Sequence, residues 1–431
     1  MPRLNRLAAL WAVLATIAAP GLRVALRLRQ SRGKEAAGRL PERRGIDRTP
    51  RPAGRLIWLH AASVGETMSI MPVLPALAEQ APDATLLLTT GTVTSADLFA
   101  RRLPDLGLTH RVLHRFAPLD VPGWVRRFLD HWRPDVAGFV ESELWPNILA
   151  ACRTRGIPLM LINGRLSDRS LVRWRRVPGL ARQVLGGFAR VQARSETDAA
   201  RLREFGCCAV TAPGDLKLAA VPLPADEAEL LRLKTKLAGR PVWLAASTHP
   251  GEEALVFAVH RGLAADHPGL LTIIAPRHPE RGAAIAATAG DIPVARRALG
   301  EPPPQAGAWI VDTLGELGLW YRLSGLAFVG RSLIPPGGGQ NPLEPARLGC
   351  AVAVGPYTGN FADHVPMLRK AGGLTIVQDC DELAAWIGLL LRDPGRRQAM
   401  ADAAVAAVRR HGDLPRRTAA ALLELMPARP A

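Results

Sequence analysis

The chain has 431 residues, of which 48% are hydrophobic and 22% charged, and its formal net charge is +17. This composition is too apolar for a disordered chain, and the length suits two or three domains. Five cysteines without a Cys-x-x-Cys pair argue against a disulfide scaffold and a Cys-rich zinc module, and they are typical of a reducing compartment.

The positive charge is concentrated at the N-terminus. Residues 1–55 contain thirteen Arg or Lys side chains and only three acidic ones. No aromatic residue interleaves with the arginines between positions 23 and 55, which disfavours nucleic-acid binding. A non-enzymatic basic protein that binds membranes or nucleic acid remains one alternative interpretation of the charge.

An apolar run, LAALWAVLATIAAPGL, covers residues 7–22 and has arginines on both sides. A spanning helix needs about 20 apolar residues, so this run is short. The basic residues after it disfavour export. We therefore predict a membrane anchor and basic linker over residues 1–54, either spanning the membrane or lying in its interface, with a signal peptide or a buried helix as alternatives. The arginines of 23–55 are expected to face anionic headgroups, or else to form a solvated linker.

Short apolar runs then alternate with longer periodic segments, which is typical of parallel sheets built from βαβ units. We expect strands at 55–60, 84–90, 135–141, 158–163 and 189–193, and again at 241–247, 270–276, 309–312, 326–330, 351–355 and 374–378. A Pro-rich stretch at 221–227 separates the two series. The sequence therefore predicts an α/β protein with two Rossmann-like domains, residues 55–222 and 229–431, and a cleft between them.

Two local features refine this prediction. Pro72 and Pro75 interrupt the first expected helix, so that helix starts late or kinks. No Walker A motif and no GxGxxG follows the first strand, which disfavours a P-loop ATPase or a dinucleotide dehydrogenase.

Ligands of open α/β sheets bind at the carboxyl ends of the strands, and the polar motifs of this chain follow such ends. In HAASVGET (60–67), Glu66 stands at a helix start, where it is either a general base or a first-turn residue favoured by the helix dipole. In FVESELWPN (139–147), Glu141 and Glu143 are either site carboxylates or caps of the following helix.

Two further motifs complete the first half. INGRLSDRS (162–170) carries Asn163, Arg165, Asp168 and Arg169. Arginine forks suit phosphate or carboxylate groups, although a surface loop explains the same residues equally well. In GDLK (214–217), Lys217 can meet a developing negative charge, or it is simply a solvated lysine.

The second half offers phosphate-binding features. STHPGEE (247–253) opens a helix after a strand, and free N–H groups there bind phosphate readily. His249 and Glu252 resemble metal ligands, but no second cluster accompanies them, so no metal is expected. PRHPER (276–281) and DTLGEL (312–317) follow two other strands.

A glycine-rich loop lies within VGRSLIPPGGGQNPLEP (329–345). Gly337–Gly339 can approach a ligand closely and form an anion-binding nest, or they are a flexible loop. Asn341 and Glu344 open a helix, and Glu344 can accept ribose hydroxyls. Together these motifs describe a nucleotide-sugar site facing an acceptor domain, which is the GT-B architecture of many glycosyltransferases.

At these motifs, and at GPYTGNF (355–361), the sequence resembles the 3-deoxy-D-manno-octulosonic acid (Kdo) transferase family over nearly its whole length. The resemblance implies an inverting transfer of Kdo from CMP-Kdo to the lipid A precursor, lipid IVA. It places the reaction at the cytoplasmic face of the inner membrane, among anionic lipids, and requires no cofactor, metal or nucleic acid.

The resemblance also implies roles for individual residues. Glu66 is the general base that takes the proton from the acceptor's 6′-hydroxyl, and Glu141 and Lys217 stabilise the transition state. The CMP-binding segments correspond to Pro276, Arg277, Gly315, Glu316, Leu317, Asn341, Pro342, Leu343 and Glu344.

The chain departs from the family pattern at two positions. Arg331 replaces the second glycine of Gly-Gly-Ser, and Gln340 replaces the histidine of Gly-Gly-His-Asn. Either change can alter contacts with the donor. The alternative within the same fold is another GT-B enzyme that uses a UDP-sugar, either a transferase or an epimerase.

Overall fold

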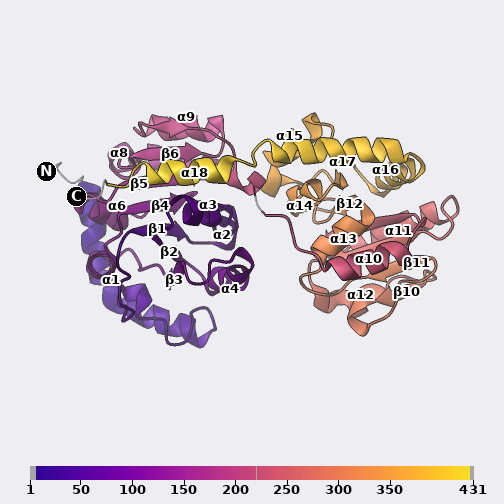
Figure 1. The fold of residues 1–431 in the computed structure, drawn as a ribbon, viewed down its shortest axis with the longest axis horizontal. Coiled ribbons are helices and arrows are strands. Elements are labelled where there is room, and N and C mark those ends of the chain that lie inside the picture. The colour runs from indigo at the N-terminus through magenta and orange to yellow at the C-terminus, as the bar shows by residue number, and fades with distance from the viewer. Residues whose placement is uncertain (1–5, 220, 428–431) are drawn as a thin grey trace. The chain divides into compact units, whose positions relative to one another are not determined.

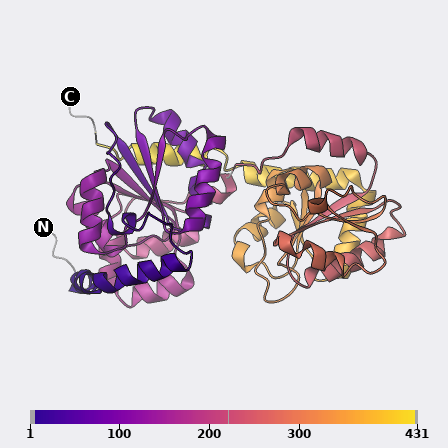
Figure 2. The same ribbon diagram turned by 90° about the horizontal axis from the view of Figure 1, so that it is seen from below.

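The computed structural model describes residues 6–219 and 221–427, and it divides into two α/β units (Figure 1). The first unit combines residues 6–219 with 411–427, and the second comprises 221–410. Each unit contains one seven-stranded sheet in which all strand pairs are parallel, with helices on both faces (Figure 2). The expected pair of Rossmann-like folds is confirmed.

The first sheet has the order β3-β2-β1-β4-β5-β6-β7. Its strands are β1 (Leu56–Ala61), β2 (Thr85–Thr90), β3 (Val112–Phe116), β4 (Val136–Val140), β5 (Leu159–Gly164), β6 (Arg190–Ala193) and β7 (Val210–Thr211). Its helices are α2 (Val64–Ile70), α3 (Val73–Gln80), α4 (Val93–Arg102), α5 (Pro122–Trp132), α6 (Pro146–Thr154), α7 (Asp168–Arg175), α8 (Pro178–Leu185), α9 (Glu196–Glu204) and α18 (Leu414–Leu423). The break between α2 and α3 falls at Met71–Pro72, as the prolines predicted.

Alternating side chains of the strands feed two separate cores. Trp58 of β1 packs with Phe128 of α5 on one face, whereas Ile57 packs with Leu74 of α3 on the other. Both faces of these strands are buried, which is why they are continuous apolar runs rather than alternating ones.

The N-terminal segment is part of the first unit. Helix α1 (Arg6–Ser31) includes Pro20 and extends well past the apolar run, and η1 (Glu42–Arg44) follows it. Leu26 of α1 packs on Val121 and Trp124. By length and composition, α1 is the one described helix that is able to cross a membrane. The prediction of a basic linker after it is wrong in part, because the side chain of Arg43 is only 4% exposed and is built into the fold.

The second sheet has the order β10-β11-β9-β8-β12-β13-β14. Its strands are β8 (Val242–Thr248), β9 (Leu271–Pro276), β10 (Val294–Arg296), β11 (Gly307–Ile310), β12 (Leu326–Val329), β13 (Ala351–Val354) and β14 (Leu374–Ile376). Its helices are α10 (Glu227–Lys236), α11 (Glu252–Ala264), α12 (Gly282–Ala286), α13 (Leu317–Ser324), α14 (Leu343–Arg347), α15 (His364–Lys370), α16 (Cys380–Arg392) and α17 (Pro394–Arg409).

The C-terminal helix corrects the predicted domain boundary. The sequence assigns residues 229–431 to the second domain, but α18 belongs to the first unit, where it lies beside α3 (Figure 1). Leu414 and Leu422 are buried in the same core as Leu74 of α3. The chain therefore returns to the first unit after α17.

Candidate active site

Both sheets reverse their strand order beside their first strand, and this switch point is where open α/β sheets bind ligands. In the first unit the switch lies between β1 and β4, which lead into Glu66 and Glu141. In the second unit it lies between β8 and β12, which lead into the 249–253 turn and the glycine-rich loop. The predicted site residues therefore gather at the carboxyl edges of the two sheets.

Glu66 and the N-cap residue Ser63 are hydrogen-bonded to each other at the start of α2. The Ser63 hydroxyl accepts a bond from the backbone N–H of Glu66 and donates to its Oε1 at 2.8 Å. The backbone N–H of Ala62 donates to Glu66 Oε2 at 2.7 Å. The predicted first-turn role is thus present in the structure. It leaves each carboxylate oxygen with a further lone pair.

The surroundings of Glu66 favour its protonated form. The residue is only 9% exposed. Burial is the largest cause that raises the pKa of Glu66, and the nearby charges of Glu143 and Glu141 add to it, against the bonds from Ser63 and Ala62. A carboxylate with a raised pKa is a stronger base than an exposed one.

Glu143, which the sequence marked together with Glu141, is hydrogen-bonded to His60, a residue that the sequence did not single out. His60 Nε2 lies 3.2 Å from Glu143 Oε2, and His60 Nδ1 lies 2.9 Å from the Thr89 hydroxyl. Burial raises the pKa of Glu143, but the contacts with His60 and Trp145 outweigh it and leave that pKa below its usual value. Glu143 therefore stays ionised beside Glu66. His60 opens the HAASVGET motif, and its place at a strand end was the available signal.

Glu141 and Lys217 meet as an ion pair. Lys217 Nζ lies 2.8 Å from Glu141 Oε1, and the two side chains are 28% and 13% exposed. Glu141 has a left-handed backbone, with φ of 57°, directly after β4. Because α2 packs against η3 (Leu216–Ala219), the helix of Glu66 and the turn of Lys217 are neighbours. The three predicted catalytic residues thus lie in one region of the first unit.

Asn163 and Asp215 hold the turn that carries Lys217. The Asn163 amide donates to Asp215 Oδ1 at 3.0 Å and accepts the backbone N–H of Leu216 at 3.0 Å. Asp215 Oδ1 also accepts the backbone N–H of Lys217 at 2.9 Å. Asn163 is 2% exposed, so it does not face solvent, and it positions Lys217 through the backbone of the 215–217 turn.

The rest of the 162–170 motif lies on the surface. Arg165, Asp168 and Arg169 are exposed, and Asp168 pairs with Arg201 at 2.6 Å. For Asp168, the surface-loop interpretation is the correct one.

In the second unit, two predicted CMP-binding segments line one cavity of about 150 Å³. Pro276 and Arg277 follow β9, and Gly315 and Leu317 lead into α13. Ser247, Thr313 and Trp320 complete much of its wall. The strands β9 and β11 are neighbours, so the sheet itself brings these segments together.

Arg277 and Arg281 are four residues apart, but only Arg281 forms an ion pair with a carboxylate. Arg281 donates to both oxygens of the buried Glu253, at 2.7 and 3.1 Å. Arg277 is exposed at the cavity and makes no ion pair within the described part of the chain. An uncompensated guanidinium is suited to a phosphate or carboxylate ligand.

Glu316 is occupied by protein contacts. Arg297 donates to Glu316 at 2.8 Å and to Glu229 at 2.8 Å, and the Thr313 hydroxyl also donates to Glu316. Burial raises the pKa of Glu316, but these contacts outweigh it and lower that pKa overall. The segment therefore presents Gly315 and Leu317 to the cavity, while the Glu316 carboxylate fixes the loop.

Glu252, like Glu316, holds a loop in place through its carboxylate. Its carboxylate accepts four backbone N–H groups, from His249, Arg331, Ser332 and Leu333. This clamp joins the turn after β8 to the loop after β12. Across residues 6–219 and 221–427, no group of three or more His, Cys, Asp or Glu is placed to hold a metal ion.

The glycine-rich loop corrects a further prediction. Gly338 and Gly339 donate their N–H groups to the carbonyls of Tyr357 and Arg331, so these two amides are not available as an anion nest. A Cβ at Gly337 would lie 2.2 Å from the Tyr357 Cβ. The glycines are therefore needed because the loop packs closely on the segment after β13.

The remaining predicted residues follow this loop at the same edge of the sheet. Asn341 donates to Glu344 at 3.1 Å and accepts the backbone N–H of Leu343. Gln340 contacts His249 at 2.9 Å, so this departure from the family pattern links the loops after β12 and β8. Pro342, like Leu343, is buried, and none of these residues lines the cavity at Arg277.

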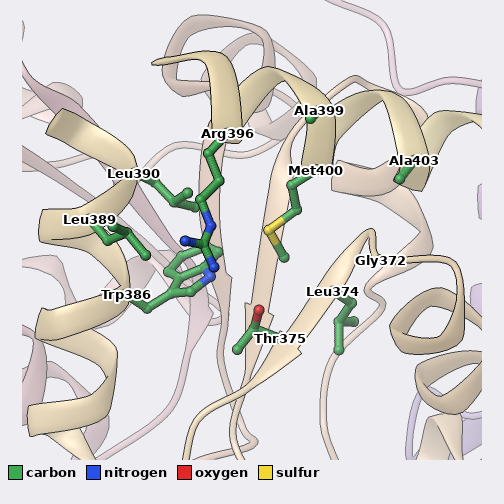
Figure 3. Close-up of a pocket in the computed structure, with 10 residues that line it drawn as sticks. All are labelled: Gly372, Leu374, Thr375, Trp386, Leu389, Leu390, Arg396, Ala399, Met400 and Ala403. Atoms are coloured by element: carbon green, nitrogen blue, oxygen red, sulfur yellow. The ribbon is translucent and has the colours of Figure 1, made fainter. Parts of the chain in front are cut away.

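A second cavity in this unit, of about 440 Å³, lies between β14, α16 and α17 (Figure 3). Arg396 and Met400 both extend into it from α17, and Arg396 reaches toward Trp386 (Figure 3). None of the predicted site residues lines it.

Two doubly wound units with charged groups at both switch points define a protein of the GT-B fold class. The fold is similar to UDP-GlcNAc 2-epimerase from Neisseria meningitidis, with a TM-score of 0.58 at 14% identity, covering 86% of this chain and 100% of that one. For a glycosyltransferase from Rickettsia africae the TM-score is 0.58 at 13% identity, covering 88% of this chain and 100% of that one. Likeness at this level shows the fold alone.

The sequence comparisons are more specific. The family model described as 3-deoxy-D-manno-octulosonic-acid transferase (kdotransferase) matches residues 38–220. The chain is 36% identical to the 3-deoxy-D-manno-octulosonic acid transferase of Bordetella pertussis, covering 87% of this chain and 88% of that protein. For the 3-deoxy-D-manno-octulosonic acid transferase of Haemophilus influenzae the identity is 33%, covering 85% of this chain and 86% of that protein. The chain therefore belongs to the Kdo transferase family and is a glycosyltransferase.

Proposed function

We propose that this chain is an inverting transferase that moves Kdo from CMP-Kdo to the lipid A precursor, lipid IVA. The acceptor's 6′-hydroxyl oxygen attacks the anomeric carbon of Kdo while its proton passes to Glu66. The bond from that carbon to the phosphate oxygen breaks, and CMP leaves. The observation that carries the proposal is a buried carboxylate of raised pKa at the first switch point, in a chain of this family.

Glu141 and Lys217 act on charge in the transition state. A sugar-transfer transition state is oxocarbenium-like, and carboxylates near it are stabilising. The Lys217 ammonium meets the negative charge that accompanies the departing cytidylate. Their 2.8 Å ion pair holds both groups in place before substrate binds.

The donor binds at the second unit. The exposed guanidinium of Arg277 suits the phosphate of CMP, because an arginine fork matches two phosphate oxygens. Gly315 and Leu317 supply the neighbouring wall. The Asn341–Glu344 segment contributes the remaining contacts to the nucleotide, as the family resemblance implies.

Helix α1 anchors the enzyme at the cytoplasmic face of the inner membrane, among anionic lipids. The Trp11 indole N–H donates to Asp120 at 2.8 Å, and Leu26 packs on Val121 and Trp124. Contacts near both ends of the helix favour one that lies along the unit, in the membrane interface, over one that leaves it to span the bilayer. Ile17 is 70% exposed, which leaves it available to insert into the lipid.

The test is mass spectrometry of the lipid product. Purified full-length chain in detergent micelles is incubated with lipid IVA and either CMP-Kdo or a panel of UDP-sugars. We expect a Kdo-bearing lipid with CMP-Kdo alone, and its mass gives the number of sugars added. Transfer from a UDP-sugar, or no transfer from CMP-Kdo, would overturn the proposal.

A further inference from the structure

The N-terminal basic segment contains an arginine that the proposed mechanism does not use. Arg43 and Glu35 form an ion pair of 3.0 Å in which both side chains are nearly inaccessible, at 4% and 3% exposed. Glu35 also accepts a bond from Arg29 at 2.8 Å. Arg29 lies in the last turn of α1, so Glu35 joins the anchor helix to Arg43.

The other nitrogens of Arg43 reach the carboxyl edge of the first sheet. Nη1 donates to the carbonyl of Ala117 at 3.3 Å, just after β3, and Nη2 donates to the carbonyl of Gly91, just after β2. The guanidinium also lies 4.7 Å from the centre of the Phe116 ring. Arg43 therefore braces the ends of two neighbouring strands.

From Gly91 the contacts continue to the candidate base. The Gly91 N–H donates to the carbonyl of Ala62 at 2.9 Å, and the Ala62 N–H donates to Glu66 at 2.7 Å. The two backbones are so close that a Cβ on Gly91 would lie 2.8 Å from the Ala62 oxygen. An unbroken series of hydrogen bonds thus runs from α1 to Glu66.

Burying a charged pair is costly, and apolar residues of the same volume often stabilise a fold equally well. The buried pair of Arg43 and Glu35 is better explained by the geometry that it imposes on the ends of β2 and β3. We propose that Arg43 and Glu35 are positioning residues, which set the place of Glu66 by holding Gly91 against the β1–α2 turn. The inference rests on the proposed role of Glu66 as base.

Arg43→Lys tests the idea, because lysine keeps the charge but lacks the planar fork that serves Glu35 and two carbonyls together. We expect kcat for Kdo transfer to fall about tenfold, since small misplacements of a catalytic group are costly. The KM for CMP-Kdo stays constant. The matched control is Arg39→Lys. Arg39 stacks on the Phe116 ring at 4.5 Å, as Arg43 does, and it pairs with Glu42. It does not bond Gly91.

The pH–rate profile separates positioning from general loss of structure. The Ala62 N–H bond lowers the pKa of Glu66, so weakening it moves the acid limb of kcat/KM to higher pH. Glu143 and Glu141 also face Glu66, and neither is touched by the change. We expect this shift in Arg43→Lys and in Gly91→Ala, which disturbs the same turn without altering Arg43, and not in Arg39→Lys.

The outcomes are distinct. Equal kcat and equal acid limbs in Arg43→Lys and Arg39→Lys would overturn the positioning role. If Glu66→Gln keeps full activity, the proposed base is wrong, whatever the Arg43 variants do. If Glu66→Gln is inactive and the two arginine variants behave alike, the inference alone fails.

Discussion

The carboxyl edges of the two sheets differ in one acidic side chain, Glu66. In the first unit, Glu66 is buried with a raised pKa. In the second unit, the carboxylates of Glu252, Glu253 and Glu316 are bonded to backbone amides or arginines that shape the loops. Arg277 at the second edge makes no ion pair within the described part of the chain. One edge therefore suits proton transfer, and the other suits the binding of a preformed anion.

This difference predicts which substitutions affect chemistry and which affect folding. At the first edge, isosteric changes should abolish turnover and leave stability intact. At the second edge, most acidic residues should matter for stability, and Arg277 for substrate binding. The following experiments test that division.

The largest effect is expected for Glu66→Gln. Glutamine fills the same space, and its amide oxygen can still accept from Ala62 while its NH2 donates to the Ser63 hydroxyl oxygen, but it cannot take a proton, so kcat should fall about a thousandfold. The raised pKa means that ionised Glu66 opposes folding, a cost that appears as pH rises above the unfolded value of about 4.5. The free energy of unfolding at neutral pH should therefore not decrease.

The control for this variant is Ser63→Ala, which removes the cap and keeps the carboxylate. It should lower stability by about 1 kcal/mol and retain most of the activity. If Ser63→Ala is as inactive as Glu66→Gln, the carboxylate matters as a cap rather than as a base. Single-turnover assays and urea denaturation measure the two properties separately.

Glu252→Gln should show the reverse behaviour. The amide can accept only through its one oxygen, so some of the four backbone N–H groups lose their partner, at a cost of about 2–3 kcal/mol. The control is Glu280→Gln, whose side chain is 75% exposed. A Glu252 variant that unfolds like the parent protein in urea, but no longer turns over, would contradict the division between the two edges.

The fold was predictable where burial dominates the sequence. Strands covered on both faces are apolar runs, and each such run was identified. The three strands that were not expected, β3, β7 and β10, all lie at sheet edges. Edge strands are short or polar, as in β3 with His114 and Arg115, so their sequences resemble loops. The return of α18 to the first unit was also missed, because nothing in its amphipathic pattern specifies which surface it covers.

The site was predictable as a set of positions but not as a set of contacts. Motifs at strand ends located Glu66, Glu141 and Lys217, since the topology brings such ends together. The sequence could not show that the glycine amides at 338 and 339 are already bonded, or that the linker arginine Arg43 is buried. Both facts depend on tertiary contacts, such as those of Gly338 with Tyr357 and of Arg43 with Gly91, which local pattern does not encode.

A moderate effect is expected at Arg277. Replacing it by alanine removes a charge-assisted contact to the donor of about 1.5 kcal/mol, which is about a tenfold rise in the KM for CMP-Kdo. The matched variant is Arg281→Ala, which leaves the buried Glu253 unpaired and should lower stability with a smaller change in KM. Similar KM values in the two variants would remove Arg277 from the donor site.

The smallest effect is the position of the acid limb in the pH profile of the unaltered protein. Glu66 must be ionised to accept a proton, so kcat/KM falls as pH drops through its pKa, and burial places that pKa above the ordinary 4.5. Burial raises the pKa of Glu143 and of Glu316, but contacts with His60 and Trp145 outweigh it at Glu143, and contacts with Arg297 outweigh it at Glu316. Both pKa values are therefore lowered, and both carboxylates stay ionised above pH 4.5. A single acid limb above 4.5 therefore reports on the first edge alone. A limb below 4.5 would mean that the base is a carboxylate with a lowered pKa, such as Glu143, and not Glu66.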